Sequence, residues 1–140
     1  MIRAKQILIL NGPNLNLLGK REPETYVAKS FEEYFVELKA EFPALELSYF
    51  QSNLEGELVD KIQEPNWDGI VLNSAGYSHT SVALRDAVSA VKTPVVEVHI
   101  SNIAARESFR HDSLISPVAV GCITGFGLKS YALALNYYLD

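Results

Sequence analysis

The sequence predicts an open, doubly wound parallel β-sheet with helices on both faces, and three observations support this fold class. Five short β-like runs recur along the chain, each is followed by a segment that can be helical, and neither a linker nor an internal repeat interrupts the alternation. The length of 140 residues suits a single domain, 1–140, that can bury a core of its own. The expected strands run from Gln6 to Leu10, Leu45 to Phe50, Gly69 to Leu72, Val95 to Val98 and Val118 to Ile123.

The helix after the first strand carries the clearest local signal. Ser30 and Glu33 form a capping box, in which each side chain can accept a hydrogen bond from the other residue's backbone N–H. Apolar residues then follow at helical spacing: Phe31, Tyr34, Phe35, Leu38 and Phe42. This pattern predicts a helix that begins directly after Ser30.

Prolines end the next two predicted helices. Ser52 or Asn53 can cap the second helix, and Pro65 stops it. Its expected buried face consists of Leu54, Leu58 and Ile62. Thr80 or Ser81 can cap the third helix, which ends before Pro94. The buried stripe expected there consists of Leu84, Ala87, Val88 and Val91.

A short helix from Ile103 to Phe109 and a final one from about Leu128 to Leu139 complete five strand–helix units. The flavodoxin-like strand order 2-1-3-4-5, with three layers α/β/α, is the natural solution for five such units. Three tyrosines on the final helix, Tyr131, Tyr137 and Tyr138, suit either the core or a subunit interface.

Composition excludes several classes of protein. Apolar runs such as Ile7 to Leu10 are far shorter than the roughly 20 residues that cross a bilayer, and the first residues lack the pattern of a signal peptide. We therefore expect a cytoplasmic protein without a membrane partner. The 12 basic and 17 acidic residues give a net charge of −5, with no basic stripe for nucleic acid. Cys122 is the single cysteine, so it forms no internal disulfide, and the three histidines show no metal-ligand spacing.

Polar side chains follow four of the expected strands at their carboxyl ends, in residues 11–14, 51–53, 73–79 and 99–102. Ligands of doubly wound sheets bind outside these ends. Taken singly, each segment is typical of a turn. Taken together, His79, His99 and several amides at one edge favour a binding or catalytic site.

Two further segments of the sequence resemble functional loops. Residues 125–130 look like a phosphate loop, but Leu128 and Ser130 stand where the known phosphate-binding motifs require glycine, so we expect a tight turn into the final helix. Residues 11–29 form a longer connection than the usual βα loop of about two to six residues. This connection is either a solvated charged loop or a binding loop in which Arg21 and Tyr26 act together.

Four blocks of the sequence carry a resemblance to a known family. They are residues 11–23 (NGPNLNLLGKREP), 50–53 (FQSN), 73–87 (NSAGYSHTSVALRDA) and 97–102 (EVHISN). In this order they resemble type II 3-dehydroquinate dehydratase, and the resemblance covers essentially the whole chain. It implies a lyase without metal or organic cofactor that reversibly dehydrates 3-dehydroquinate to 3-dehydroshikimate through an enolate, in aromatic biosynthesis by the shikimate pathway or in quinate breakdown.

The resemblance also implies how the reaction begins. Tyr26 would be the base that removes the α-proton, and Asn14 would stabilise the enolate through an ordered water. An ordinary tyrosine has a pKa near 10, so only about one in a thousand is ionised at pH 7. Arg21 would lower the pKa of Tyr26, as a nearby cation can by about 1 to 3 units.

His99 would be the general acid that protonates the departing hydroxyl. Glu97 precedes it by two positions and therefore lies on the same side of the strand, where its carboxylate can orient the imidazole. A buried ion pair with a purely structural role is the alternative interpretation of Glu97 and His99.

The expected substrate contacts lie on several elements. Backbone N–H groups of Ile100 and Ser101 would bind the substrate carboxylate. Side chains matching the family's contacts to the ring hydroxyls and their support are Asn73, His79, Asp86 and Arg110. Asp86, next to Arg85, is equally typical of a surface ion pair. Arg106 is expected near the lid and His111 at the surface, both outside direct contact with substrate.

One departure from the family concerns Val27, which stands where a glycine usually follows the catalytic tyrosine. Valine restricts the backbone more than glycine does, so the closing of the loop can differ while the chemistry is retained. We expect Val27→Gly to keep activity within a modest factor.

The family implies a homododecamer, a tetramer of trimers. Two alternatives stay open at this point. A different α/β enzyme for a small carboxylated sugar-like acid would fail to turn over 3-dehydroquinate, and a flavin-binding module of the same fold would purify as a yellow protein.

Overall fold

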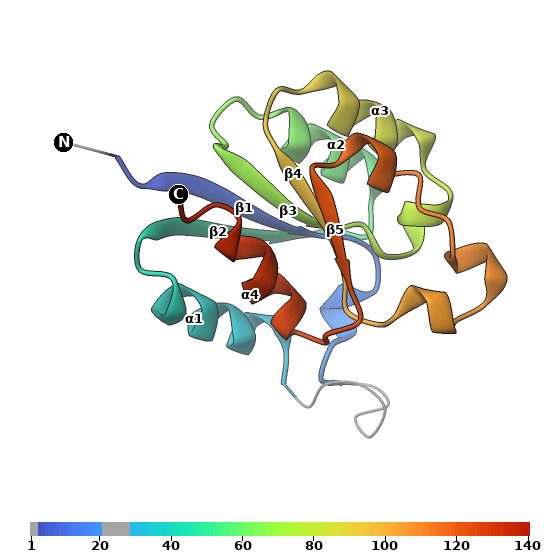
Figure 1. Cartoon of the computed structure of the whole chain (residues 1–140), viewed down its shortest axis with the longest axis horizontal. Coiled ribbons are helices and arrows are strands. Elements are labelled where there is room, and N and C mark those ends of the chain that lie inside the picture. The colour runs from blue at the N-terminus through green and yellow to red at the C-terminus, as the bar shows by residue number, and fades with distance from the viewer. Residues whose placement is uncertain (1–2, 21–28) are drawn as a thin grey trace.

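The computed structural model describes residues 3–20 and 29–140. Within them, five strands form one parallel sheet in the order β2-β1-β3-β4-β5, which confirms the predicted flavodoxin-like arrangement. The strands are β1 (Lys5–Asn11), β2 (Leu45–Gln51), β3 (Gly69–Asn73), β4 (Val95–His99) and β5 (Gly121–Thr124). Helices α1 (Phe31–Glu41) and α4 (Lys129–Asn136) cover one face of the sheet, and α2 (Glu55–Gln63) and α3 (Val82–Ala90) cover the other (Figure 1).

Strand β1 contributes to the cores on both faces. Ile7 and Ile9 belong to the cluster that includes residues of α1 and α4, whereas Leu8 and Leu10 belong to the cluster that includes residues of α2 and α3. Successive side chains of a strand point to opposite faces, so a strand covered on both sides is apolar throughout. This central strand ends in the buried Asn11, at the edge where the candidate site lies.

The predicted helix starts are confirmed for α1 and α3. The Ser30 hydroxyl accepts a hydrogen bond from the Glu33 N–H at 3.1 Å, and the Glu33 carboxylate accepts one from the Ser30 N–H at 3.0 Å. Ser81 caps α3 by accepting from the Leu84 N–H at 2.9 Å. Both caps satisfy N–H groups that have no partner within the helix.

The start of α2 differs from the prediction. Leu54 is the N-cap residue and is 62% exposed, so its expected place on the buried face is wrong, while Leu58 and Ile62 are buried as predicted. Leu54 precedes the first helical turn and therefore falls outside the helical periodicity. Ser52 lies nearby and accepts a hydrogen bond from the Leu54 N–H at 2.9 Å, although it is not the cap itself.

The last third of the chain is less regular than predicted. Strand β5 begins three residues later than predicted, because residues 116–118 form a short 3-10 helix that has a proline near its start. Two 3-10 turns, Ile103–Ala105 and Ser108–Arg110, replace the single expected helix. Gly125 and Gly127 have positive φ angles of 98° and 63° and form the expected turn before α4.

The three C-terminal tyrosines divide between core and surface. Tyr131 and Tyr138 are buried, and Tyr137 is 54% exposed. Within the described residues, the structure contains no helix with the length and apolar character needed to span a membrane.

Candidate active site

A cavity of about 190 Å³ opens at the carboxyl edge of the sheet, beyond the ends of β1, β3 and β4. The cavity is lined by six residues that the sequence predicted as site residues at this edge. Arg110, from a later turn, is a seventh predicted residue that lines it. The six come from the ends of β1, β3 and β4 and the turns after them. They are Asn14, Asn73, His79, His99, Ile100 and Ser101. The fourth polar segment, at the end of β2, does not line the cavity but contacts the turn that carries Asn14. Its Asn53 side chain accepts a hydrogen bond from the Asn14 N–H at 3.0 Å.

The turn after β1 places Asn14 at the mouth of this cavity. A Cβ atom on Gly12 would lie 2.7 Å from the Ser74 carbonyl oxygen, so a glycine is required where this turn meets the turn after β3. Asn14 itself has a φ of 70°, a left-handed conformation that asparagine tolerates better than most residues. Its side chain is exposed, so the backbone rather than side-chain packing fixes its position.

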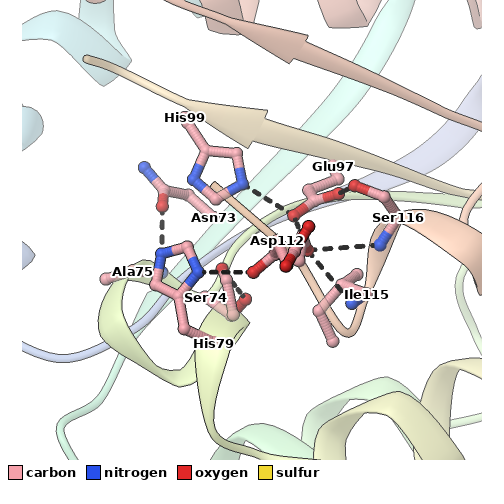
Figure 2. Close-up of polar contacts among 11 residues, drawn as sticks. Asn73, Ser74, Ala75, His79, Glu97, His99, Asp112, Ile115 and Ser116 are labelled. Carbon is pink, nitrogen blue, oxygen red and sulfur yellow. Dashed lines mark hydrogen bonds and ion pairs between the residues drawn. The ribbon is translucent and has the colours of Figure 1, made fainter. Parts of the chain in front are cut away.

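Asn73 ends β3 and is held at both ends of its side-chain amide. Its Oδ1 accepts a hydrogen bond from the Ala75 N–H at 3.1 Å, and its Nδ2 donates to the Tyr131 hydroxyl at 2.9 Å. The side chain is almost fully buried and lies in the wall of the cavity, and Figure 2 shows it between His99 and the turn that carries Ala75. Its orientation is therefore set before a ligand arrives.

Glu97 and His99 form a buried pair on β4. The His99 Nε2 and Glu97 Oε2 atoms are 2.6 Å apart, and the exposed fractions of the two residues are 4% and 0%. The predicted placement on one side of the strand is confirmed. Because a carboxylate can only accept, Nε2 carries the hydrogen and Nδ1 is left for the cavity, and Figure 2 shows the second ring nitrogen turned away from Glu97.

Two serines complete the surroundings of the Glu97 carboxylate. Ser113 donates to Oε2 at 2.5 Å, and the Ser116 hydroxyl donates to Oε1. Burial acts to raise the pKa of Glu97, but the hydrogen bonds from His99, Ser113 and Ser116 and the charge of His99 outweigh it, so the pKa is held below its usual value. Glu97 therefore stays ionised although it is fully buried.

His79 approaches His99 from the turn after β3. The two rings are stacked, with centroids 6.2 Å apart and planes inclined by 24°. The Asp112 carbonyl oxygen lies 2.8 Å from His79 Nδ1 and can only accept, so Nδ1 carries a hydrogen. In the neutral ring, Nε2 is consequently a hydrogen-bond acceptor.

Two arginines lie at the rim. Arg110 is partly buried and donates from Nε to Glu107 at 2.9 Å. Arg106 also lines the cavity, and its Nη1 lies 3.4 Å from the Ser101 hydroxyl, while the expectation that it makes no direct contact with substrate stays a prediction. His111 is exposed as predicted.

Some predicted site residues do not line the cavity or lie outside the described residues, and some lining residues were not predicted. Asp86 is exposed on α3 and is not among the residues that line the cavity. Arg21 and Tyr26 lie outside the described residues, as does Val27. Sequence reasoning missed the apolar part of the wall because these residues carry no chemical signal, although three leucines inside an otherwise polar connection could have indicated it. The missed residues are Leu15, Leu17, Leu18 and Ile103, whereas Pro13, Ala75 and Gly76 lie in segments that were expected at this edge but were not named as site residues.

One group of described residues has the composition of a metal site. The potential ligand atoms of Glu97, His99 and Cys122 all lie within 4.8 Å of one another. The Glu97 carboxylate already accepts three hydrogen bonds, from His99, Ser113 and Ser116, and the His99 Nε2 is engaged in one of them. A metal needs free, deprotonated ligands, so this group does not fit one well.

Comparisons with known proteins identify the family and the fold of the chain. The family model described as dehydroquinase class II matches residues 5–139. The chain is 54% identical to the 3-dehydroquinate dehydratase of Bacillus licheniformis over 138 residues, which are 96% of this chain and 95% of the relative. Among solved structures, the type II dehydroquinase from Butyrivibrio crossotus DSM 2876 superposes with a TM-score of 0.93 at 42% identity, covering 98% of this chain and 99% of that one. The type II dehydroquinase from Propionibacterium acnes gives 0.90 at 40% identity, covering 99% and 98%.

Proposed function

The chain belongs to the class II dehydroquinase family and catalyses the dehydration of 3-dehydroquinate to 3-dehydroshikimate, a step of the shikimate pathway, and we propose that His99 is the general acid of this reaction. The observation that carries the proposal is the buried contact of 2.6 Å between His99 and Glu97 at the wall of the cavity. In this contact Nε2–H donates to Glu97, so Nδ1 is the nitrogen available to donate a proton to a substrate in the cavity.

Loss of water from 3-dehydroquinate needs one group that removes the α-proton and another that donates a proton to the leaving hydroxyl. When the His99 ring is charged, Nδ1 carries the proton that moves to the hydroxyl oxygen as the carbon–oxygen bond breaks. The ionised Glu97 stabilises that charged ring through Nε2–H. After the transfer, His99 is neutral with its Nε2–H bond intact, and Nδ1 can accept a new proton from water.

The base belongs to the other half of the proposal. Tyr26 would remove the α-proton as tyrosinate, with Arg21 stabilising its negative charge, and the electron pair would move into an enolate. Asn14 would stabilise the enolate oxygen through a water molecule. The support for Tyr26 and Arg21 is their match to the family's sequence blocks, and the support for Asn14 is its place at the mouth of the cavity.

Substrate binding divides among the remaining wall residues. The backbone N–H groups of Ile100 and Ser101 would bind the carboxylate. Asn73, His79 and Arg110 would bind the ring hydroxyls, and all three line the cavity. Asp86 is exposed on α3 and does not line the cavity, so the support for its role is its match to the family's sequence blocks alone.

The proposed assembly is the homododecamer implied by the resemblance, in the cytoplasm and without a bound cofactor. Light scattering of the purified protein tests the assembly, since a dodecamer of a 15.5 kDa chain is about twelve times heavier than the monomer. A clean monomer would contradict it.

The division of roles is tested by following the enone absorbance of 3-dehydroshikimate when 3-dehydroquinate is added to the wild type, Arg21→Gln and Tyr26→Phe. We expect both variants to bind substrate and to lose turnover. Tyr137→Phe is the matched control, because it removes an exposed hydroxyl from a tyrosine that does not line the cavity. Full turnover by Tyr26→Phe would show that Tyr26 is not the base.

A further inference from the structure

Three buried polar side chains from three elements form a continuous row of hydrogen bonds behind the cavity. They are Asn11 at the end of β1, Tyr131 on α4 and Asn73 at the end of β3, and their exposed fractions are 0%, 0% and 3%. The Tyr131 hydroxyl oxygen lies 2.8 Å from Asn11 Oδ1 and 2.9 Å from Asn73 Nδ2. Of the three, only Asn73 lines the cavity.

The direction of every hydrogen bond in this row is determined. The Ala75 N–H can only donate, so the atom of the Asn73 amide that faces it is the oxygen. The Asn73 nitrogen therefore faces Tyr131 and donates to its hydroxyl. The hydroxyl has one hydrogen of its own, and this hydrogen goes to Asn11 Oδ1.

Tyr131 serves only as a hydrogen-bonding group. Burial is the largest cause that raises the pKa of its hydroxyl far above the ordinary value, so the hydroxyl is protonated at neutral pH. Its ring packs against Phe31 with centroids 4.8 Å apart, which fixes the direction of the hydroxyl from the opposite side.

We propose that Tyr131 is a positioning residue that holds the Asn73 amide in the orientation required for substrate binding. The inference rests on the proposed substrate contact of Asn73. With Nδ2 bonded to Tyr131 and Oδ1 bonded to Ala75, Asn73 keeps one N–H and one oxygen lone pair for a substrate hydroxyl. Without the Tyr131 hydroxyl, the buried N–H loses its partner and only the hydrogen bond from the Ala75 N–H still orients the amide.

Tyr138 supplies a matched control. It lies near Tyr131 in the chain, is 3% exposed, and its hydroxyl bonds to the Ile70 and Pro94 carbonyl oxygens at 2.8 and 2.9 Å. Those carbonyls precede or begin β3 and β4, at the opposite end of the strands from the cavity. Tyr138→Phe thus removes a buried hydroxyl of the same kind without touching Asn73.

The experiment measures KM and kcat for 3-dehydroquinate in the wild type, Tyr131→Phe, Tyr138→Phe, Asn73→Ala and the double variant Asn73→Ala with Tyr131→Phe. We expect Tyr131→Phe to raise KM about tenfold with a smaller change in kcat, as one hydrogen bond can account for. Tyr138→Phe should lower the melting temperature comparably and leave KM within about twofold. In the Asn73→Ala background, Tyr131→Phe should cause no further rise in KM.

The other outcomes of the kinetic experiment overturn either the role of Tyr131 or the substrate contact of Asn73. A Tyr131→Phe variant that behaves like Tyr138→Phe, or effects of Tyr131→Phe and Asn73→Ala that add in full, would overturn the inference while the substrate contact of Asn73 stands. An unchanged KM in Asn73→Ala would overturn that contact and the inference with it. If Tyr131→Phe is not folded at the assay temperature, KM of this variant and of the wild type is measured at a lower temperature at which the variant is folded, and an equal KM there would overturn the inference.

Discussion

The two sides of the cavity differ in how firmly their side chains are held. On the β4 side, His99 and Glu97 are buried and joined by a short hydrogen bond, and two serines hold the carboxylate. On the rim, Asn14 and Arg106 are exposed. The contact of Arg106 with the Ser101 hydroxyl is as long as 3.4 Å.

This difference corresponds to two tasks. A proton transfer depends steeply on distance and direction, so the groups that perform it benefit from a rigid strand and from complete hydrogen bonding. Substrate entry and release need an open edge, which the rim provides. We therefore expect substitutions of Glu97 and His99 on the β4 side to act on kcat, and substitutions of the rim arginines Arg106 and Arg110 to act on KM.

His99→Gln should give the largest effect. Glutamine can still donate to Glu97 but cannot act as a general acid, so we expect kcat to fall about 10²- to 10⁴-fold, the usual contribution of such a group. The assay is the enone absorbance at saturating substrate. The control is His111→Gln, an exposed histidine that does not line the cavity and whose variant should keep nearly full activity.

Glu97→Gln should give the next largest effect. The substitution keeps the shape of the side chain but removes the charge that stabilises the protonated His99, so we expect kcat to fall about ten- to a hundredfold. Glu107→Gln, at an exposed acid near the rim, should change kcat far less. Equal losses of kcat in Glu97→Gln and Glu107→Gln would contradict the claim that the β4 side acts on kcat and the rim does not.

Arg110→Gln should raise KM about tenfold while kcat changes less, because it removes a charged contact for a substrate hydroxyl. Arg106→Gln should cause a smaller rise, since its side chain is more exposed than that of Arg110. Steady-state kinetics of both variants give the comparison. A fall in kcat without a change in KM for Arg110→Gln would contradict a binding role at the rim.

The smallest effect concerns stability against acid. Because the folded-state pKa of Glu97 lies below its ordinary value of 4.5, its ionised form stabilises the fold above that pH, and the contribution is lost as the pH falls below it. The free energy of unfolding should therefore be higher for the wild type than for Glu97→Gln at neutral pH, and the difference should shrink as the pH falls below 4.5. Urea unfolding of both proteins across this range measures it, and a constant difference would contradict the assigned shift.

The features predicted correctly from the sequence are those encoded within a few residues. The capping box of Ser30 and Glu33 and the shared strand face of Glu97 and His99 depend on spacings of three and two positions, and both are present in the structure. Chain order and alternation also sufficed for the strand order. Local spacing is read directly from a sequence because it fixes relative direction in a regular element.

The features that were missed depend on contacts between distant residues. Ser116 bonds to Glu97 across 19 positions and Tyr131 to Asn11 across 120, and neither pairing follows from a local pattern. The place of Arg106 in the cavity wall depends on the two 3-10 turns that replaced the expected helix. Leu54 was misplaced because a cap residue does not share the periodicity of the helix it precedes.

The most direct test of the central claim separates the two proton transfers. 3-Dehydroquinate is incubated in D₂O with His99→Gln and with Tyr26→Phe, and exchange of the α-proton is followed by NMR beside enone formation. If His99 acts only as the acid, His99→Gln exchanges the α-proton while forming almost no product, and Tyr26→Phe does neither. Product formation at the wild-type rate by His99→Gln, or loss of exchange together with dehydration in that variant, would contradict the assignment of His99 as the general acid.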